Sequence, residues 1–271
     1  MIAVSIEASY RRVARSALRQ GALSTGERAV PEEVPVAFSY AGSTHAVMMA
    51  SPADLVDFAV GFSLTEGIIS ARSEIRAIEV IEAGQGYDVQ VDLMDAEADA
   101  LRARRRHMAG PVGCGLCGIE SIEQAVRVVP DLSCVRMSIH GDDIVAAVTA
   151  LSDAQSLNRE TRAVHGAGFY SPQGGLLAVR EDVGRHNALD KLAGAVVNAG
   201  ISAKTGIVAV TSRLSVEMVQ KTAILGSPVM AAISAPTALA IETAESAGIT
   251  LVALVRGEDF EIFTRADRVI L

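Results

Sequence analysis

Hydrophobic and polar residues alternate along two stretches in the first third of the chain, and each stretch predicts a β-hairpin. Val34–Tyr40 and Thr44–Met49 flank a short glycine-containing turn, and Ile75–Glu82 and Tyr87–Leu93 flank another. A period of two with glycine between the runs is typical of paired antiparallel strands. These residues therefore predict a small sheet.

One amphipathic segment lies between the two predicted hairpins. Ser51 is expected to cap a helix whose first position is Pro52, and the helix is expected to run to Glu66 and to end at Gly67. Together with the hairpins it predicts a small α+β domain over residues 31–110. Residues 1–30 are expected to form an N-terminal arm, with Met1–Gln20 frayed.

The second half of the chain alternates short apolar runs with longer amphipathic ones. A helix at Ser138–Ser156 and a hairpin, Arg162–Tyr170 with Gly175–Arg180, are expected to come first. Helices and strands then alternate, and this pattern predicts βαβ units and a mostly parallel sheet over residues 126–271. The expected elements are helix Val183–Ala199 ending at Gly200, strand Gly206–Val210, helix Ser215–Leu225, strand Val229–Ile233, helix Thr237–Ala247, strand Ile249–Val255 and an edge strand, Phe260–Thr264.

Composition narrows the class of protein. Half of the 271 residues are hydrophobic, tryptophan is absent and the formal net charge is −8, which favours a compact α/β protein and argues against general nucleic-acid binding. Three cysteines argue against a disulfide framework and for a reducing, cytoplasmic location. Thr222–Ile241 is uncharged, but Gly226, Pro228 and Pro236 interrupt it, so we interpret it as buried core and expect no membrane span.

Two cysteines lie two residues apart, with glycines before, between and after them. Cys114 and Cys117 stand in Gly-Cys-Gly-Leu-Cys-Gly, which predicts a mobile loop over residues 111–125 and a reactive or metal-binding dithiol. A zinc site needs two further ligands at a second paired spacing, and a thioredoxin-like couple needs an early βαβ unit. A persulfide carrier needs only an accessible thiolate. Cys134 stands alone and is interpreted as a packed, inert thiol.

A basic run precedes the cysteine pair. Arg102, Arg104, Arg105 and Arg106 form a cluster that is either a solvated surface or a source of positive charge favouring the thiolate. Both interpretations remain open on the sequence.

Two charged segments are expected where strands end. Arg180–Asn187 lies between a predicted strand and a predicted helix, a position that favours an anion or nucleotide site but also suits capping and ion pairs. Leu254–Asp259 follows the last parallel strand. Its acidic side chains are able to accept hydrogen bonds from a guanine edge and Arg256 is able to meet a phosphate, although a plain turn is the alternative.

Departures from the zinc-deaminase signature argue against deamination. His165-Gly166-Ala167 places alanine where the general acid/base glutamate of such an enzyme belongs, and the cysteine pair comes before this histidine.

Several motifs together resemble the formate dehydrogenase accessory sulfurtransferase family, FdhD. The segments that carry this resemblance are Glu66–Ile69, Cys114–Gly118, His165–Gly168, Glu181–Lys191 and Ser212–Met218. The resemblance covers the chain from about Glu33 onward. It implies a cytidine-deaminase-like three-layer α/β/α domain with a smaller N-terminal α+β domain, and a homodimer.

The resemblance also implies a function. Sulfur from a cysteine desulfurase is expected to reach the Cys114 and Cys117 pair as a persulfide and to pass to the molybdenum bis(molybdopterin guanine dinucleotide) cofactor that formate dehydrogenase needs. The alternative is a zinc-stabilised binding module for an apo-oxidoreductase; we expect no structural metal. The residues expected to bind the cofactor are Leu254, Val255, Arg256, Gly257, Glu258, Asp259, Asp182, Arg185 and His186.

Overall fold

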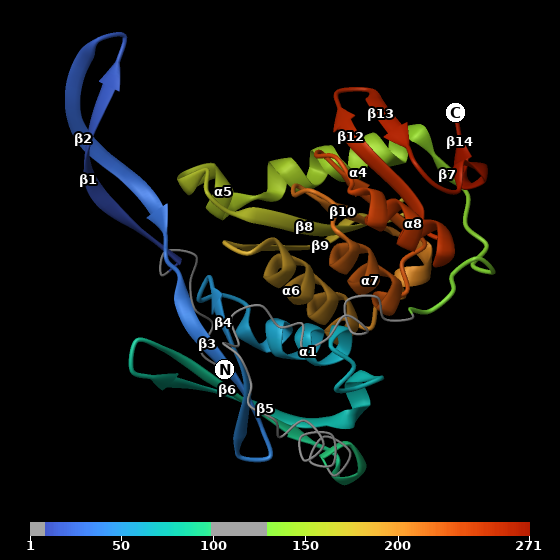
Figure 1. Cartoon of the computed structure of the whole chain (residues 1–271), viewed down its shortest axis with the longest axis horizontal. Helices are drawn as coiled ribbons and strands as arrows, with labels where there is room; N and C mark the ends of the chain where they lie inside the picture. Colours follow the sequence, from blue (N-terminus) through green and yellow to red (C-terminus); the bar gives the residue numbers. More distant parts are fainter. Residues whose placement is uncertain (1–8, 99–128) are drawn as a thin grey trace.

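Two β-sheets of different size organise the chain in the computed structural model, which describes residues 9–98 and 129–271 (Figure 1). We call residues 34–98 the small-sheet region and residues 129–271 the large-sheet region. A separate two-stranded hairpin precedes both. Residues 1–8, the Arg102–Arg106 cluster and the predicted Cys114 and Cys117 pair lie outside the described residues. The boundaries of the proposed domains stay a prediction.

The small sheet has four strands, in the order β4-β3-β6-β5. Both predicted hairpins are confirmed, and β3 joins them by pairing parallel to β6. Helix α1 covers one face of the sheet, where the Phe38 and Phe62 rings stack with their centroids 4.6 Å apart. The elements are β3 (Val34–Tyr40), β4 (Ser43–Ala50), α1 (Leu55–Thr65), a 3-10 helix (Arg72–Glu74), β5 (Ile75–Ala83) and β6 (Gly86–Leu93).

The predicted start of α1 is wrong. The helix begins at Leu55, after Asp54 in a left-handed conformation (φ 55°), and Ser51 is not its cap. Ser51 is instead fully buried, and its N–H, hydroxyl and carbonyl all bond to residues of the large-sheet region. Tertiary partners have therefore outweighed the local capping preference of serine.

The large sheet has six strands, in the order β13-β12-β11-β10-β8-β9. Strands β10, β11 and β12 run parallel, as the alternating pattern predicted, and β13 lies at one edge. The elements are β7 (Ile139–His140), α4 (Gly141–Ala154), α5 (Ser156–Thr161), β8 (His165–Ser171), β9 (Gly175–Asp182), α6 (Arg185–Asn198), a 3-10 helix (Ala203–Thr205), β10 (Ile207–Val210), α7 (Val216–Leu225), β11 (Val229–Ala232), α8 (Ala238–Ser246), β12 (Thr250–Arg256), β13 (Asp259–Ile262), a 3-10 helix (Ala266–Arg268) and β14 (Val269–Ile270).

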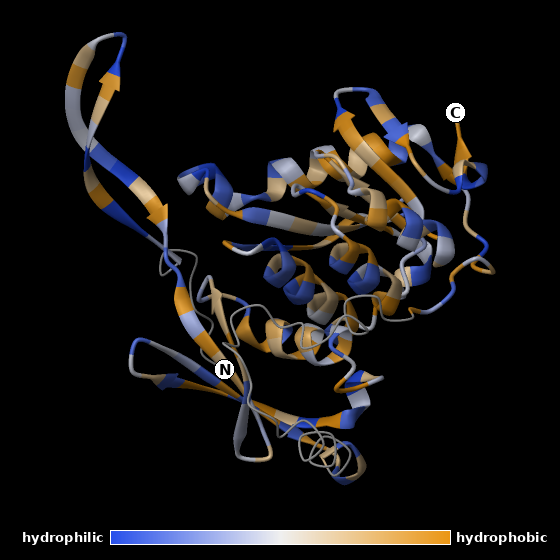
Figure 2. Ribbon diagram, in the orientation of Figure 1, coloured by the Kyte–Doolittle hydropathy of each residue, from blue (hydrophilic) through white to orange (hydrophobic). Residues whose placement is uncertain are grey.

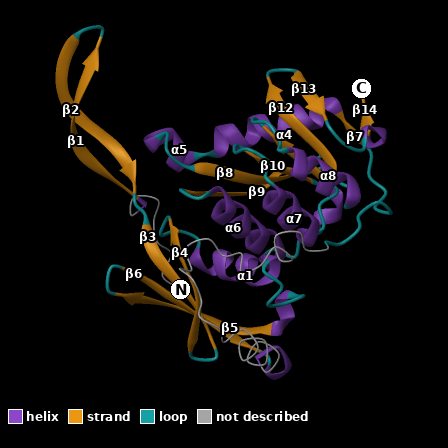
Figure 3. Ribbon diagram, viewed as in Figure 1, coloured by secondary structure: helices purple, strands orange, loops and turns teal. Residues whose placement is uncertain are grey.

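Helices cover the two faces of the large sheet. Side chains of α4 share one buried cluster with the sheet, and side chains of α6, α7 and α8 share another. Figure 3 shows α6, α7 and α1 between the two sheets. The predicted helix over Ser138–Ser156 corresponds to α4, which begins later, at Gly141, because Ile139–His140 form β7, and ends at Ala154, because the chain leaves helical geometry at Gln155 (φ −72°, ψ 85°). The short helix α5, which follows from Ser156, was not predicted. In the part of the chain that the structure describes, no helix is both long and apolar enough to cross a membrane.

Helices α1 and α6 approach each other at two glycines. A Cβ atom added to Gly61 would overlap the carbonyl of Asp190, and one added to Gly194 would overlap the carbonyl of Asp57. Side chains are excluded at these points, so the two backbones are in direct contact. The two sheets are thereby held at a short distance from each other.

The N-terminal arm forms an ordered hairpin from Tyr10 onward, which corrects the expectation that Met1–Gln20 is frayed. Strands β1 (Tyr10–Arg19) and β2 (Ala22–Pro31) pair antiparallel along their whole length. The turn between them uses Gln20 and Gly21, both with positive φ. Arginines at several positions hid the alternation that marks a strand. In Figure 1 the hairpin projects away from both sheets.

Candidate functional site

Four strands of the large sheet end at one edge, which we call the carboxyl edge. Parallel pairing brings the ends of β10, β11 and β12 together, and β9 ends there too because it is antiparallel to β8, which is itself antiparallel to β10. Helices α6, α7 and α8 begin at this edge. The N–H groups of helix N-termini favour anions, so the carboxyl edge is a candidate anion or nucleotide site.

The first turn of α6 carries two of the predicted site residues, Arg185 and His186. The Nε2 atom of His186 lies 2.7 Å from Oε2 of Glu217 and 3.5 Å from Oγ of Ser215. The hydrogen bond with His186 lowers the pKa of Glu217. Both side chains are about 30% exposed. This pair joins the N-termini of α6 and α7 while leaving one side of each group open to solvent.

Arg185 has a buried hydrogen-bond donor without an acceptor among the described residues. Its Nε is buried and has no hydrogen-bond partner among them. His165 lies nearby, and burial, followed by the charge of Arg185, lowers the pKa of His165. Arg185 itself is a cation in the first turn of α6. A buried donor without a partner is costly, so this atom fits an arrangement completed by an acceptor on a ligand.

Asp182 has a different environment, although the sequence grouped it with Arg185 and His186. Its carboxylate is fully buried, lies 2.6 Å from Nζ of Lys191, and accepts hydrogen bonds from the N–H groups of Ser51 and Gly184 and from Asn187. These partners occupy both oxygens. Asp182 therefore links Ser51 of the small-sheet region to Lys191 of α6, in agreement with the capping and ion-pair interpretation. Its contact with a cofactor stays a prediction.

Leu254, Val255, Arg256, Gly257, Glu258 and Asp259 form the end of β12, a turn and the start of β13. Leu254 has a left-handed backbone (φ 56°), and the pairing of β12 with β13 shifts its register between Ala253 and Arg256. A bulky residue in this conformation stores strain, which often marks a functional position. Arg256, Glu258 and Asp259 are exposed. The segment thus lies at the carboxyl edge, with three charged side chains open to solvent.

The two segments predicted to bind the cofactor, Arg180–Asn187 and Leu254–Asp259, therefore lie on the same edge of the sheet but at a distance from each other. β9, which leads to Arg185, is four strands from β12, a separation of about 19 Å at the usual strand spacing. Sequence reasoning missed the pairing of His186 with Glu217. Glu217 stands in one of the motifs that carry the family resemblance, but nothing in the spacing of the two residues indicates that they meet.

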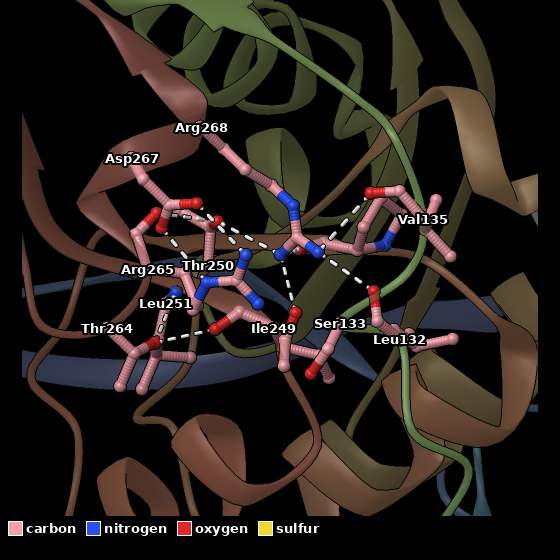
Figure 4. A network of polar contacts seen from close by, with 12 residues as sticks. Leu132, Ser133, Val135, Ile249, Thr250, Leu251, Thr264, Arg265, Asp267 and Arg268 are labelled. Carbon is pink, nitrogen blue, oxygen red and sulfur yellow. Dashed lines mark hydrogen bonds and ion pairs between the residues drawn. The ribbon is translucent and has the colours of Figure 1, made fainter.

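The described residues next to the cysteine segment are fixed to different regions. Ala98 packs against the core of the small sheet, whereas Val129 packs against the core formed by α6, α7 and α8. Arg268 fixes the chain downstream of the cysteine segment, because its guanidinium donates to the carbonyls of Leu132 and Val135, as Figure 4 shows. The same guanidinium also donates to the carbonyl of Gly248. The described residues on the two sides of the predicted sulfur site are therefore anchored to different sheets, Ala98 to the small one and Val129 to the large one.

Cys134 is exposed, which corrects its interpretation as a packed thiol. Its neighbour Leu132 is buried and takes the core position, and the Asp131 side chain accepts a hydrogen bond from the N–H of Ser133 to form a turn. Within residues 9–98 and 129–271, which the structure describes, no group of three or more His, Cys, Asp or Glu side chains is placed to hold a metal ion. The predicted absence of a structural metal stays a prediction, because the Cys114 and Cys117 pair is not described.

With the fold and the carboxyl edge established, the chain is assigned to a class of protein by its match to a known family. Residues 31–270 match the FdhD/NarQ family, and the chain belongs to that family. It is 89% identical over 271 residues, all of both chains, to a protein of Agrobacterium fabrum named sulfur carrier protein FdhD. A protein of the same name from Brucella abortus is 57% identical over 260 residues, which cover 96% of this chain and 97% of the other.

One solved structure has the same overall arrangement. It is the crystal structure of a candidate formate dehydrogenase accessory protein from Desulfotalea psychrophila, with a TM-score of 0.77 and 26% sequence identity. The match covers 96% of this chain and 99% of the other. The agreement extends over the two sheets and is not confined to one of them.

Proposed function

We propose that this protein is a sulfur carrier for the maturation of formate dehydrogenase. It accepts sulfur from a cysteine desulfurase as a persulfide and passes it to the molybdenum bis(molybdopterin guanine dinucleotide) cofactor, acting as a sulfurtransferase. The observation that carries the proposal is the identity of 89% over the whole chain with a protein named as a sulfur carrier. Family membership from residue 31 to residue 270 supports it.

Cys114 and Cys117 carry the sulfur chemistry in this proposal. The Cys114 thiolate attacks the terminal sulfur of the donor persulfide, a new S–S bond forms on Cys114, and the donor cysteine leaves as a thiolate. The Cys117 thiolate then attacks the Cys114 sulfur, which releases the terminal sulfur as sulfide to the cofactor and leaves a Cys114–Cys117 disulfide. A thiol reductant restores the pair. Each step exchanges one S–S bond, and the two electrons come from the dithiol.

The carboxyl edge of the large sheet is the proposed cofactor site. An extended dinucleotide suits an edge whose two charged segments are separated by four strands. Arg185, with its unsatisfied buried Nε, and Arg256 are the proposed phosphate-facing cations, and Glu258 and Asp259 are the proposed guanine acceptors. The layering is proposed to be cytidine-deaminase-like, with Ala167 in the place of the glutamate that deamination needs.

The proposed setting is the cytoplasm, with cysteine desulfurase as donor, formate dehydrogenase as client and a homodimer as the assembled form. The formal charge of −8 argues against a nucleic-acid partner.

Sulfur loading tests the proposal directly. The purified protein is incubated with a cysteine desulfurase and cysteine, and the intact mass is measured. We expect one added sulfur, about 32 Da, that maps to the Cys114 peptide, is removed by a thiol reductant and disappears in Cys114→Ala. Client maturation is expected to fail in Cys114→Ala while the client still binds its molybdenum cofactor.

Cys134→Ala is the matched control, because Cys134 is an exposed thiol outside the proposed pair. We expect this variant to load sulfur and mature the client as the wild type does, and to change the free energy of unfolding by less than about 1 kcal/mol. Normal client maturation in both Cys114→Ala and Cys117→Ala would contradict the sulfur-carrier function. One zinc ion per chain that is lost in Cys117→Ser, without any added sulfur, would support the zinc-stabilised binding module instead.

Nucleotide titration tests the cofactor site separately. GDP is expected to bind more tightly than ADP, and Arg256→Ala with Asp259→Ala is expected to remove that preference. Equal affinity for the two nucleotides, or unchanged GDP binding in the double variant, would place the guanine site elsewhere.

A further inference from the structure

The β1–β2 hairpin, which we call the arm, differs in charge from the rest of the chain. Residues 10–31 contain five arginines and one glutamate, a formal charge of +4, whereas the whole chain carries −8. The arm also precedes the segment that the family match covers, apart from its last residue. Membership of the family therefore assigns no role to these arginines.

The strand register separates most of the arginines from the exposed leucines near the tip. Cross-strand partners lie on the same face of a hairpin, and side chains alternate between the two faces along each strand. Arg15, Arg19 and Arg28 share one face, whereas the pair Leu18 and Leu23 lies on the other. Figure 2 shows that hydrophilic and hydrophobic residues alternate along the arm. The arginine face therefore needs an explanation of its own.

A cleft of about 380 Å³, which we call the arm cleft, lies between the arm and the end of α5. The arm is held beside α5 by Arg28, whose guanidinium donates to the carbonyl of Thr161. Five arginines and two glutamates line the cleft: Arg12, Arg15, Arg19, Arg28 and Arg162, with Glu27 and Glu160. Arg12 and Glu27 come from the face opposite Arg15, which the twist of a two-stranded ribbon allows (Figure 1). The lining thus has an excess of three positive charges.

Most of these arginines lack an acidic partner in the part of the chain that the structure describes. Arg12, Arg15, Arg19 and Arg162 form no ion pair with the carboxylates of residues 9–98 and 129–271. Guanidinium groups that share a cleft without opposite charges repel one another, and a bound anion removes that repulsion. The arrangement therefore favours an anionic ligand.

Arg162 occupies a backbone position that favours glycine. It ends α5 in a left-handed conformation (φ 56°), and its N–H donates to the carbonyl of Asn158. Glycine is the usual residue at such a helix end, because a Cβ atom disfavours this conformation. The side chain of Arg162 lines the arm cleft. A cation kept at a position that favours glycine fits a ligand-binding role.

The arm cleft adjoins the carboxyl edge without sharing its predicted site residues. Strand β8 begins at His165, close after Arg162, and His165 stands opposite Asp182 at the end of β9. Among the described residues that line the cleft, none belongs to Arg180–Asn187 or Leu254–Asp259. The cleft is therefore a separate site beside the first strands of the large sheet.

We propose that the arm cleft binds a diphosphate or triphosphate group. A phosphate chain carries several negative charges on adjacent groups, which matches an excess of three cations in a cleft of small-molecule size. An acidic peptide matches less well, because side chains on one face of an extended segment are about 7 Å apart. Glu27 and Glu160 interrupt the positive lining, which disfavours a long polyanion such as nucleic acid. This site is additional to the proposed sulfur-carrier function.

Titration calorimetry with inorganic pyrophosphate tests the site in the full-length protein. Arg185→Ala with Arg256→Ala is the parent for this test, because it removes the cations proposed to face phosphates at the carboxyl edge. We expect the parent to bind one pyrophosphate per chain, with a dissociation constant that rises as salt increases from about 0.05 M to about 0.5 M. Arg15→Gln with Arg19→Gln in this parent is expected to raise the dissociation constant roughly tenfold or more.

Arg136→Gln with Lys204→Gln is the charge-matched control, because both residues are exposed and lie outside the cleft. We expect this variant to bind pyrophosphate as the parent does. Circular dichroism checks that each variant is folded.

Two further changes alter the lining in opposite senses. Glu27→Gln with Glu160→Gln should tighten pyrophosphate binding, because it removes the two negative charges that oppose the ligand. Arg162→Gly should weaken binding while the unfolding temperature stays the same or rises, because glycine relieves the left-handed backbone. A purely structural Arg162 would instead lower the unfolding temperature and leave binding unchanged, which would contradict its place in the site.

A phosphate chain of this kind occurs in free nucleotides and in the dinucleotide cofactor of the proposed function. If the cofactor supplies it, bound cofactor excludes pyrophosphate from the arm cleft of the wild type. If a free nucleotide supplies it, cofactor and pyrophosphate bind together, and ADP and GDP bind the parent equally. Either result supports a phosphate site and identifies the source.

Three results would overturn the inference: a parent that binds no pyrophosphate, an Arg15 and Arg19 variant that binds it as tightly as the parent, or an oligoglutamate peptide that binds the parent and is not displaced by pyrophosphate. Sulfur loading on Cys114 is measured separately in the wild type. Its failure would therefore contradict the proposed function and leave the pyrophosphate result unaffected.

Discussion

Two groups of charged side chains lie along helix α6, and they differ in burial and in available partners. Where the small-sheet region packs against α6 and α7, a contact that we call the seam, Lys191 pairs with Asp182 and Lys221 pairs with Asp190. These side chains are at most 6% exposed. At the carboxyl edge, His186 pairs with Glu217, and both are about 30% exposed. One continuous motif, Glu181–Lys191, thus supplies residues to an internal anchor and to a candidate ligand site.

The seam pairs are ionic contacts surrounded by additional donors and acceptors. Burial opposes the charge of Lys221, but Asp190 and Glu66 outweigh it and raise the pKa of Lys221. Burial raises the pKa of Asp190, while Lys221 and a hydrogen bond from Thr65 oppose that rise. Nζ of Lys221 lies 2.9 Å from both Asp190 oxygens and from Glu66, so the geometry favours the ionised pair.

The comparison shows that burial decides how much a charged side chain contributes to the stability of the fold. Removing one partner of a buried pair leaves an uncompensated charge and costs about 3–5 kcal/mol, whereas exposed pairs contribute roughly 0–1 kcal/mol. Variants at the seam should therefore change stability, and variants at the carboxyl edge should change binding.

The largest expected effect is that of Lys191→Met, which leaves Asp182 buried without its cation. We expect the free energy of unfolding to fall by about 3–5 kcal/mol. Urea denaturation measures it, with Lys204→Met at an exposed position as the control. A loss below 1 kcal/mol would show that the hydrogen bonds from Ser51, Gly184 and Asn187 suffice to hold the Asp182 carboxylate.

Gly194→Ala should follow in size, because the added Cβ overlaps the carbonyl of Asp57 and separates α1 from α6. Overpacking of this kind costs about 1–3 kcal/mol. Thermal unfolding measures it beside Gly26→Ala, where the added Cβ meets no atom within 4 Å. Equal stability of the two variants would mean that the helices are able to move apart freely.

Arg185→Ala should separate binding from stability. Loss of a charge-assisted hydrogen bond of about 1.5–3 kcal/mol should weaken binding of the molybdenum bis(molybdopterin guanine dinucleotide) cofactor roughly tenfold or more. The free energy of unfolding should change by less than about 0.5 kcal/mol. Calorimetric titration and denaturation give the two values.

Arg180→Ala is the control for Arg185→Ala, because both arginines lie in the segment Arg180–Asn187. Nε of Arg180 donates to Asp57 across the seam at 2.9 Å, so this change should lower stability and leave binding of the dinucleotide cofactor unaltered. The comparison between seam and edge fails if Arg180→Ala weakens binding of the dinucleotide cofactor as much as Arg185→Ala does.

The smallest expected effect is a pH dependence at Glu217. Its pKa in the folded protein is lowered from the ordinary 4.5. The unfolded state therefore takes up this proton first as the pH falls, so the stabilisation is complete above the unfolded pKa and is lost as the pH falls through the folded pKa. Glu217→Gln should be less stable than the wild type at pH 7, and the difference should disappear at an acidic pH below the folded pKa of Glu217. A difference that is the same at both pH values would rule out ionisation as its source.

Local sequence patterns predicted most of the regular elements. Both hairpins of the small sheet, the parallel strands and the helix ends at Gly67 and Gly200 are confirmed, because alternation and glycines with positive φ are local properties of the chain. The arm was the main failure, since five arginines hide its strand pattern. At Cys134 the local apolar context was misleading, because the neighbouring Leu132 takes the buried position.

The sequence by itself determined the order of most elements from Val34 onward, the family and the identity of the motif residues, because these depend on residues close together along the chain. Only the tertiary structure decided which motif residues serve the seam and which face the carboxyl edge. Asp182 and Arg185 are three residues apart. The carboxylate of Asp182 is bonded to Lys191 and Ser51, whereas the buried Nε of Arg185 has no hydrogen-bond partner among the described residues. Ser51 lies 131 residues from Asp182. Burial depends on such distant partners, and no local pattern records them.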